Sequence, residues 1–223
     1  EYMDALNLHL YPAGTAPEAY EPQLAQLRRM LRDAGRPNLS IWGTECGMYA
    51  DDDEAMSPAF HWNAILGSER QCSEYLVRFA AVTLGYGVEK LFYHYGAAGT
   101  VNEGDPESIF FEYAGAPRKM LSAQAVFCRL VPGNCRVLQI AQLHPQARTY
   151  LFGGPQGKVM LAWAPDASDR MALRLAHPAL AAVDIMGAPL RERTVVLSES
   201  PLYVMGPASI TVEEFWAAVH VGE

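Results

Sequence analysis

A single carboxylate, Glu45, ends the apolar run over residues 39–47 and is the first candidate for chemistry in this sequence. Period-2 alternation predicts a strand with Glu45 at its C-terminal mouth. One face of that strand carries Ile41, Gly43 and Glu45, and the opposite face carries Trp42 and Thr44. Barrels of parallel strands and helices place their catalytic groups at this mouth. Taken alone, the stretch favours a surface glutamate that caps an ordinary buried strand. The sequence on either side is needed to distinguish this from a catalytic glutamate.

A second group of polar side chains alternates with leucines over residues 1–11. Asn7, His9 and Tyr11 fall on one face of the predicted strand, and leucines fall on the other. The leucines can pack under helices while the polar groups point into a cavity, although a half-exposed edge strand would show the same pattern. Because the chain begins within this strand, without an initiator Met or a signal peptide, we expect the natural chain to be longer.

The elements around these strands follow a regular order. A leucine stripe predicts a helix over residues 17–35, closed by Gly35, between the two strands. The sequence then predicts a helix over 68–84, a strand over 88–95 and a helix over 117–130. Strand, helix and strand joined by short links form the βαβ unit, which implies parallel pairing and a right-handed crossover.

The loop after Glu45 has two features with alternative interpretations. Its acidic run at residues 51–54 has carboxylates that can bind a cation. The spacing lacks the Gly and the final Glu of a calcium loop, so a solvated charge run is favoured. Trp62 is either a platform on which a sugar ring stacks or an anchor for the loop.

The composition changes after residue 133. Short alternating runs, separated by Gly, Pro and Asp turns and without an intervening helix, predict an antiparallel β-sandwich over 134–223. The runs are 137–140, 149–152, 158–163, 171–175, 183–186, 194–197 and 202–205. Thr211 followed by Glu214 is typical of a capping box and predicts a last short helix that ends near Val219.

Charge and composition exclude several classes of partner. The 223 residues carry 17 Lys and Arg against 25 Asp and Glu, a net charge of -8, and a nucleic-acid partner would need a positive stripe. No apolar run reaches the ~20 residues that span a bilayer, and no basic amphipathic stripe indicates binding to a membrane surface. The cysteines, none at C-x-x-C spacing, are Cys46, Cys72, Cys128 and Cys135. A Cys128–Cys135 bridge and the cellular compartment both stay open.

The order of these motifs resembles a known family. Residues 4–11, 42–47, 69–78 and 87–95 look like strands six to eight, with a helix, of a clan A (β/α)8 glycoside hydrolase. The nearest likeness is to family 39 and related members with a β-sandwich after the barrel, and residues 184–187 and 201–206 resemble segments of such sandwiches. The resemblance implies an α/β fold: the C-terminal part of a TIM barrel over 1–133 and a sandwich domain over 134–223.

The same resemblance implies a site. Glu45 stands where the clan has its catalytic nucleophile, at the end of strand seven, and His9 and Tyr11 match the strand-six pair that lines the sugar subsite. Tyr93 falls where the clan usually has a Trp under the sugar ring, and His94 is expected to point away as a packing residue. The residues expected to contact the sugar are Asn7, His9, Tyr11, Trp62 and Tyr93.

The implied activity is retaining hydrolysis of a β-linked glycoside or polysaccharide, without a cofactor. It requires two carboxyl groups about 5 Å apart, one a nucleophile and the other an acid/base. Glu45 supplies the first, and a Tyr hydroxyl or an imidazole that donates to it would favour its charged form. The acid/base belongs to strand four, which this sequence lacks. We therefore expect another polypeptide, an N-terminal segment or a separate chain, to complete the barrel, and no activity from these residues alone.

Two alternatives remain at this stage. One is a catalytically inactive, carbohydrate-binding relative, because a barrel fold does not guarantee activity. The other is a metal-dependent barrel hydrolase that uses His9, Glu45 and His94. It is weaker, because His94 has the wrong strand parity and the sequence has no H-x-H pair.

Overall fold

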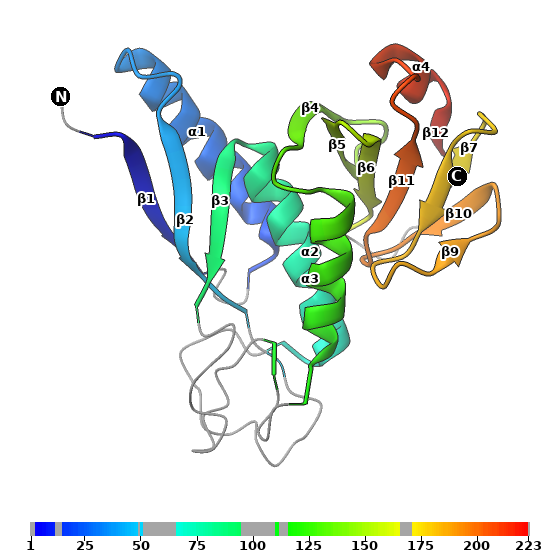
Figure 1. Ribbon diagram of the computed structural model, residues 1–223, viewed down its shortest axis with the longest axis horizontal. Helices are drawn as coiled ribbons and strands as arrows, with labels where there is room; N and C mark the ends of the chain where they lie inside the picture. The colour runs from blue at the N-terminus through cyan, green and yellow to red at the C-terminus, as the bar shows by residue number, and fades with distance from the viewer. Residues whose placement is uncertain are drawn as a thin grey trace. The chain divides into compact units, whose positions relative to one another are not determined.

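The computed structural model describes residues 3–11, 15–48, 50, 66–94, 110–111, 116–165 and 171–222 (Figure 1). Contacts divide the chain into two compact units, Glu1–Gln124 and Ala125–Glu223. The boundary between the units falls inside the helix Lys119–Leu130. The predicted division into barrel and sandwich parts at residue 133 stays a prediction.

The first unit contains a parallel sheet with the strand order β1-β2-β3. Its strands are β1 (Ala5–Leu10), β2 (Ser40–Cys46) and β3 (Val88–Tyr93). Its helices are the 3-10 turn η1 (Pro17–Ala19), α1 (Tyr20–Asp33), α2 (Glu69–Gly85) and the start of α3 (Lys119–Leu130). Figure 1 shows the strands running in one direction, with α1 and α2 on one side of the sheet. The predicted order of elements and the parallel pairing are confirmed.

Helix α2 is buried almost all the way round, and two of its hydroxyl side chains bond within the helix. The Ser68 side chain caps its N-terminus by accepting a hydrogen bond from the Gln71 backbone N–H at 3.1 Å. The hydroxyl of Ser73 donates to the Glu69 carbonyl, and that of Thr83 donates to the Phe79 carbonyl, both at 2.7 Å. Hydroxyls that bond to their own helix can be buried without the cost of an unpaired polar group.

Arg28 of α1 anchors the N-terminal ends of two strands. Its guanidinium donates to the carbonyls of Leu39, before β2, and of Tyr86 and Gly87, before β3. Gly87 has φ 86°, which favours glycine, and a Cβ at this position would lie 2.5 Å from Nη2 of Arg28 and displace the guanidinium. One side chain therefore fixes the helix against both strand entries.

The second unit contains two antiparallel sheets, with the strand orders β4-β5-β6-β11-β8-β9 and β10-β7-β12. The larger sheet comprises β4 (Arg136–Ala141), β5 (Arg148–Gly154), β6 (Gly157–Trp163), β8 (Ala181–Val183), β9 (Pro189–Leu190) and β11 (Leu202–Gly206). The smaller comprises β7 (Met171–Leu175), β10 (Thr194–Leu197) and β12 (Val219–Gly222). Side chains of both sheets, among them Met160 and Leu173, share one buried core with Phe215 of the helix over 212–217. The β-sandwich designation remains a prediction.

The end of the chain confirms one prediction and corrects two others. Thr211 and Glu214 form the predicted capping box at the start of α4 (Val212–Ala217). The chain then continues as β12, a strand beside β7 that the sequence pattern did not predict. The predicted strand over 183–186 is wrong beyond Val183, because the Asp184 carboxylate accepts the backbone N–H groups of Met186 and Ala188 and holds a turn.

No helix in the described part of the chain is long and apolar enough to span a membrane.

Candidate active site

The register of β2 places Glu45 on a different face from the one that alternation predicts. Leu8 of β1 pairs with Gly43, but His9 pairs with Glu45, so Thr44 is an extra residue in β2. The pairing with β3 passes from Gly43 to Cys46 with the same irregularity. Such a bulge turns the following side chains to the other face of the sheet.

The two faces of the sheet differ in polarity as a result. Ile41, Gly43 and Cys46 line the buried face, where a Cβ on Gly43 would meet the side chains of Leu10 and Leu91. The opposite, more open face carries Asn7, His9, Trp42, Glu45, Lys90 and Phe92. The prediction that Glu45 shares a face with Ile41 and Gly43 is therefore wrong, and the bulge is the reason. The register places Asn7 and His9 on one face, as predicted, and the hydroxyl of Tyr11, which follows β1, bonds to Glu45 of that face.

Two side chains of the first strand segment converge on one oxygen of Glu45. The Tyr11 hydroxyl donates to Oε2 at 3.0 Å, and Nδ1 of His9 lies 3.3 Å from the same atom. The Glu45 side chain is 35% exposed and that of His9 is 56% exposed. Within the described residues, Oε1 accepts no hydrogen bond. One oxygen thus contacts Tyr11 and His9, while the other leaves its lone pairs open among these residues.

Asn7 is tied to the bulge itself. The hydroxyl of Thr44, the extra residue, donates a hydrogen bond to Oδ1 of Asn7. On the same face, the ammonium of Lys90 lies 4.3 Å from the centre of the Trp42 ring, a cation–π contact, and Phe92 packs beside that ring. Asn7 therefore supports the β2 backbone next to Glu45.

The end of β3 brings His94, rather than Tyr93, toward this group. The His94 ring lies edge-on to Tyr11, with ring centres 6.4 Å apart, and its backbone N–H donates to the Cys46 carbonyl at 2.9 Å. Tyr93 pairs with Cys46, on the face opposite to Glu45, and its ring packs against Phe110. The expectation that His94 points away from the site is wrong, because the bulge in β2 puts Glu45 on its side. The contact of Tyr93 with a sugar stays a prediction that the register does not favour.

Trp62 and the acidic run at 51–54 lie outside the described residues. In the described ranges, no group of three or more His, Cys, Asp and Glu side chains is placed to hold a metal ion.

The cysteines of the structure are free thiols. Burial raises the pKa of Cys46 to about 12, and its Sγ contacts the Phe92 carbonyl at 3.3 Å. Burial also raises the pKa of Cys72. These two thiols are buried packing groups and not nucleophiles. The bridge between Cys128 and Cys135, which the sequence left open, is not formed.

Comparison with known proteins gives matches at the level of structure only. No family model and no curated protein match the sequence. A GH30 endoxylanase from Clostridium papyrosolvens C71 matches over 92% of this chain and 49% of its own, with a TM-score of 0.52 and 14% identity. The family 30 subfamily 8 xylanase Xyn30A from Clostridium acetobutylicum has a TM-score of 0.51 and 10% identity, over 92% of this chain and 56% of its own.

A glucosidase from Croceicoccus marinus matches over 90% of this chain and 53% of its own, with a TM-score of 0.50 and 12% identity. The chain spans about half the length of these solved structures. Its fold is therefore similar to part of GH30 glycoside hydrolases, which belong to clan A, while the specific likeness to family 39 is not confirmed.

Proposed function

We propose that this chain is part of a retaining glycoside hydrolase that acts on a β-linked glycoside or polysaccharide, with Glu45 as its nucleophile. The observation that carries the proposal is the convergence of Tyr11 and His9 on Oε2 of Glu45, at the C-terminal end of β2. The similarity to glycoside hydrolase folds supports it at the level of the fold.

The proposed reaction has two steps. In the first, Oε1 of Glu45 attacks the anomeric carbon, and a bond forms between them as the glycosidic bond breaks and an acid protonates the leaving oxygen. In the second, water attacks the anomeric carbon and the bond to Glu45 breaks. The group that acted as the acid in the first step now acts as a base and takes the proton of the water. The hydrogen bond from the Tyr11 hydroxyl to Oε2 fixes the direction of the carboxylate.

The acid/base would come from polypeptide outside residues 1–223. A pair of carboxyl groups about 5 Å apart is needed, and in this proposal an added (β/α) segment places the second one opposite Glu45 and closes the barrel. The open polar face of β1, β2 and β3 is the surface such a segment would enclose. Asn7, His9 and Tyr11, with Trp62, are the proposed sugar contacts in this half, and the second unit is the proposed β-sandwich.

Covalent labelling tests the proposal. The natural protein that contains this chain would be incubated with a mechanism-based fluoro-glycoside, digested, and examined by peptide mass. We expect the mass of the sugar on the peptide that contains Glu45, and none on the Glu45→Gln variant. A folded protein that binds sugar by calorimetry but is never labelled would instead be the inactive, carbohydrate-binding relative.

A further inference from the structure

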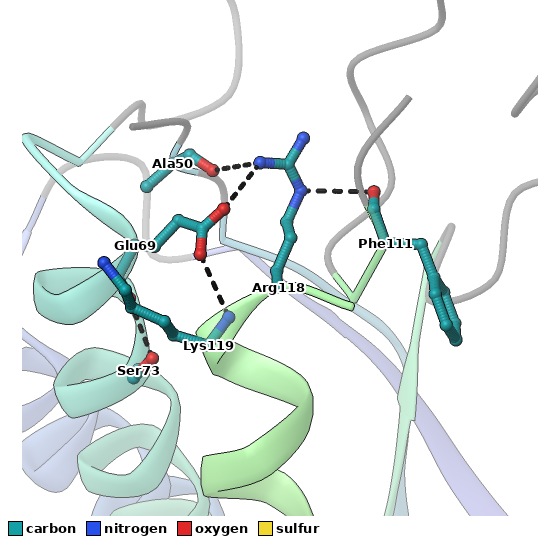
Figure 2. A network of polar contacts seen from close by, with 6 residues as sticks. All are labelled: Ala50, Glu69, Ser73, Phe111, Arg118 and Lys119. Carbon is teal, nitrogen blue, oxygen red and sulfur yellow. Dashed lines mark hydrogen bonds and ion pairs between the residues drawn. The ribbon is translucent and has the colours of Figure 1, made fainter. Parts of the chain in front are cut away.

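A buried arginine connects the segments that leave β2 and β3. Arg118 precedes the first residue of α3, and its side chain is 1% exposed. Its Nε donates to the Phe111 carbonyl at 3.1 Å, and its Nη1 lies 3.3 Å from the Ala50 carbonyl (Figure 2). Nη1 also donates to Oε1 of Glu69 at 3.0 Å. A single guanidinium thus bonds to three partners, Phe111, Ala50 and Glu69.

Glu69 uses its second oxygen to position α3. Oε2 accepts the backbone N–H of Lys119, the first residue of α3, at 3.0 Å. The Glu69 side chain is 4% exposed, so both of its oxygens are paired inside the protein. Figure 2 shows the two helix starts meeting at this carboxylate. Hydrogen bonds thus join the start of α2, the start of α3 and Ala50, which follows β2 and is called here the exit of β2. These three segments form one junction.

This junction lies a short distance along the chain from Glu45. Between Glu45 and the anchored Ala50 carbonyl, the side chains of Met48 and Ala50 are almost fully buried. The second anchored segment contains Phe110, whose carbonyl accepts the Arg118 N–H at 2.8 Å and whose ring packs on Tyr93 at the end of β3. The segment that follows β2 and the segment that follows β3 are thus both bonded to Arg118.

We propose that Arg118 and Glu69 are positioning residues, which fix the direction of the Glu45 carboxylate by holding the exit of β2 against the start of α3. The chemical part of this inference rests on the proposed function. The structural part, that the junction sets the geometry of the β2 exit, does not.

The simpler explanation is that the pair only stabilises the fold, and the chain offers a matched control for it. Arg78, also on α2, forms two hydrogen bonds with Glu18 of η1, at 2.8 and 2.6 Å. The side chains of this second pair are 8% and 9% exposed. Each pair is buried and has one member on α2, but only the first bonds to Ala50 after β2.

The test compares two conservative variants of each pair in the natural protein. Arg118→Lys leaves one ammonium that cannot reach Ala50, Phe111 and Glu69 together, and Glu69→Gln turns an amide donor toward another donor. Arg78→Lys and Glu18→Gln disturb the control pair in the same way.

Two readouts separate positioning from stability. The first is hydrogen–deuterium exchange of the His94 backbone amide, which bonds to the Cys46 carbonyl beside Glu45. The second is the rate of fluoro-glycoside labelling, with kcat and KM for hydrolysis. We expect the Arg118 and Glu69 variants to exchange His94 faster and to lose kcat on the order of 100-fold with KM nearly unchanged. The control variants should change neither, even where they lower the melting temperature by as much.

The outcomes are distinct. Unchanged exchange of His94 in the Arg118 and Glu69 variants would overturn the proposal whether or not the protein hydrolyses glycosides. Equal effects from both pairs would reduce it to general stabilisation. Faster exchange of His94 only in the first pair, in a protein that shows no labelling at all, would support the junction and reject the proposed function separately.

Discussion

The two side chains that contact Oε2 of Glu45 should contribute unequally to its reactivity, and the structure gives the order. Tyr11→Phe removes only the hydroxyl that donates to Oε2 at 3.0 Å. A hydrogen bond to a charged group is worth about 1.5–3 kcal/mol, which corresponds to a loss of about 10- to 150-fold in rate if it is fully expressed in the transition state. Because the contact is only partly buried, we expect the lower end of this range.

His9 is the weaker partner by the same reasoning. Its side chain is 56% exposed, and an exposed ion pair contributes no more than about 1 kcal/mol, or about fivefold in rate. His9→Gln should therefore slow covalent labelling of Glu45 less than Tyr11→Phe does. Labelling rates at subsaturating fluoro-glycoside, read by intact mass, measure both variants directly.

A control variant removes a tyrosine hydroxyl from the second unit of the chain. Among described residues, the buried hydroxyl of Tyr203 has no hydrogen-bond partner, and Tyr203→Phe should leave the labelling rate unchanged. A larger loss from His9→Gln than from Tyr11→Phe, or no loss from either, would refute the assignment of Tyr11 as the main donor.

Further predictions concern stability and thiol reactivity. Arg28→Ala should lower the free energy of unfolding by about 3 kcal/mol in a denaturant titration, because three carbonyls lose a charged donor, whereas the exposed neighbour Arg29→Ala should change it little. Thr211→Ala should cost about 1 kcal/mol through loss of the helix cap. The hydrogen bond from the Thr211 backbone N–H lowers the pKa of Glu214. The difference in free energy of unfolding between the natural protein and Glu214→Gln should therefore be largest above about pH 4.5 and should shrink as the pH falls through that lowered pKa. A gap that persists in acid would contradict this. Native Cys46 should resist iodoacetamide near neutral pH and react once the protein is unfolded, as mass spectrometry can show.

The strands and helices of the first unit were predictable because their signals are local. Leucines at helical spacing give α1, and the alternation of Asn7 and His9 with leucines gives β1. The capping box at Thr211 was predictable for the same reason, since its partners lie one turn apart.

The face of Glu45 was not predictable, because it depends on pairing between strands. Alternation assumes an unbroken strand, and nothing in the residues around Thr44 marks an extra position until Leu8 and His9 of β1 are laid beside it. His94 was misplaced for the same reason. The Arg118–Glu69 junction joins residues 49 positions apart, and no spacing rule covers such a distance.

The extra residue in β2 decides which face of the sheet carries the Glu45 carboxylate. A strand of the same length without the bulge would pair Thr44 with His9 and Glu45 with Leu10, and its carboxylate would turn into the layer under the helices. An alignment guided by hydrophobic pattern alone would then match Glu45 with a packing residue of a relative. Loss of Thr44 would remove the bulge and leave Glu45 opposite His9, on the open face of a regular strand.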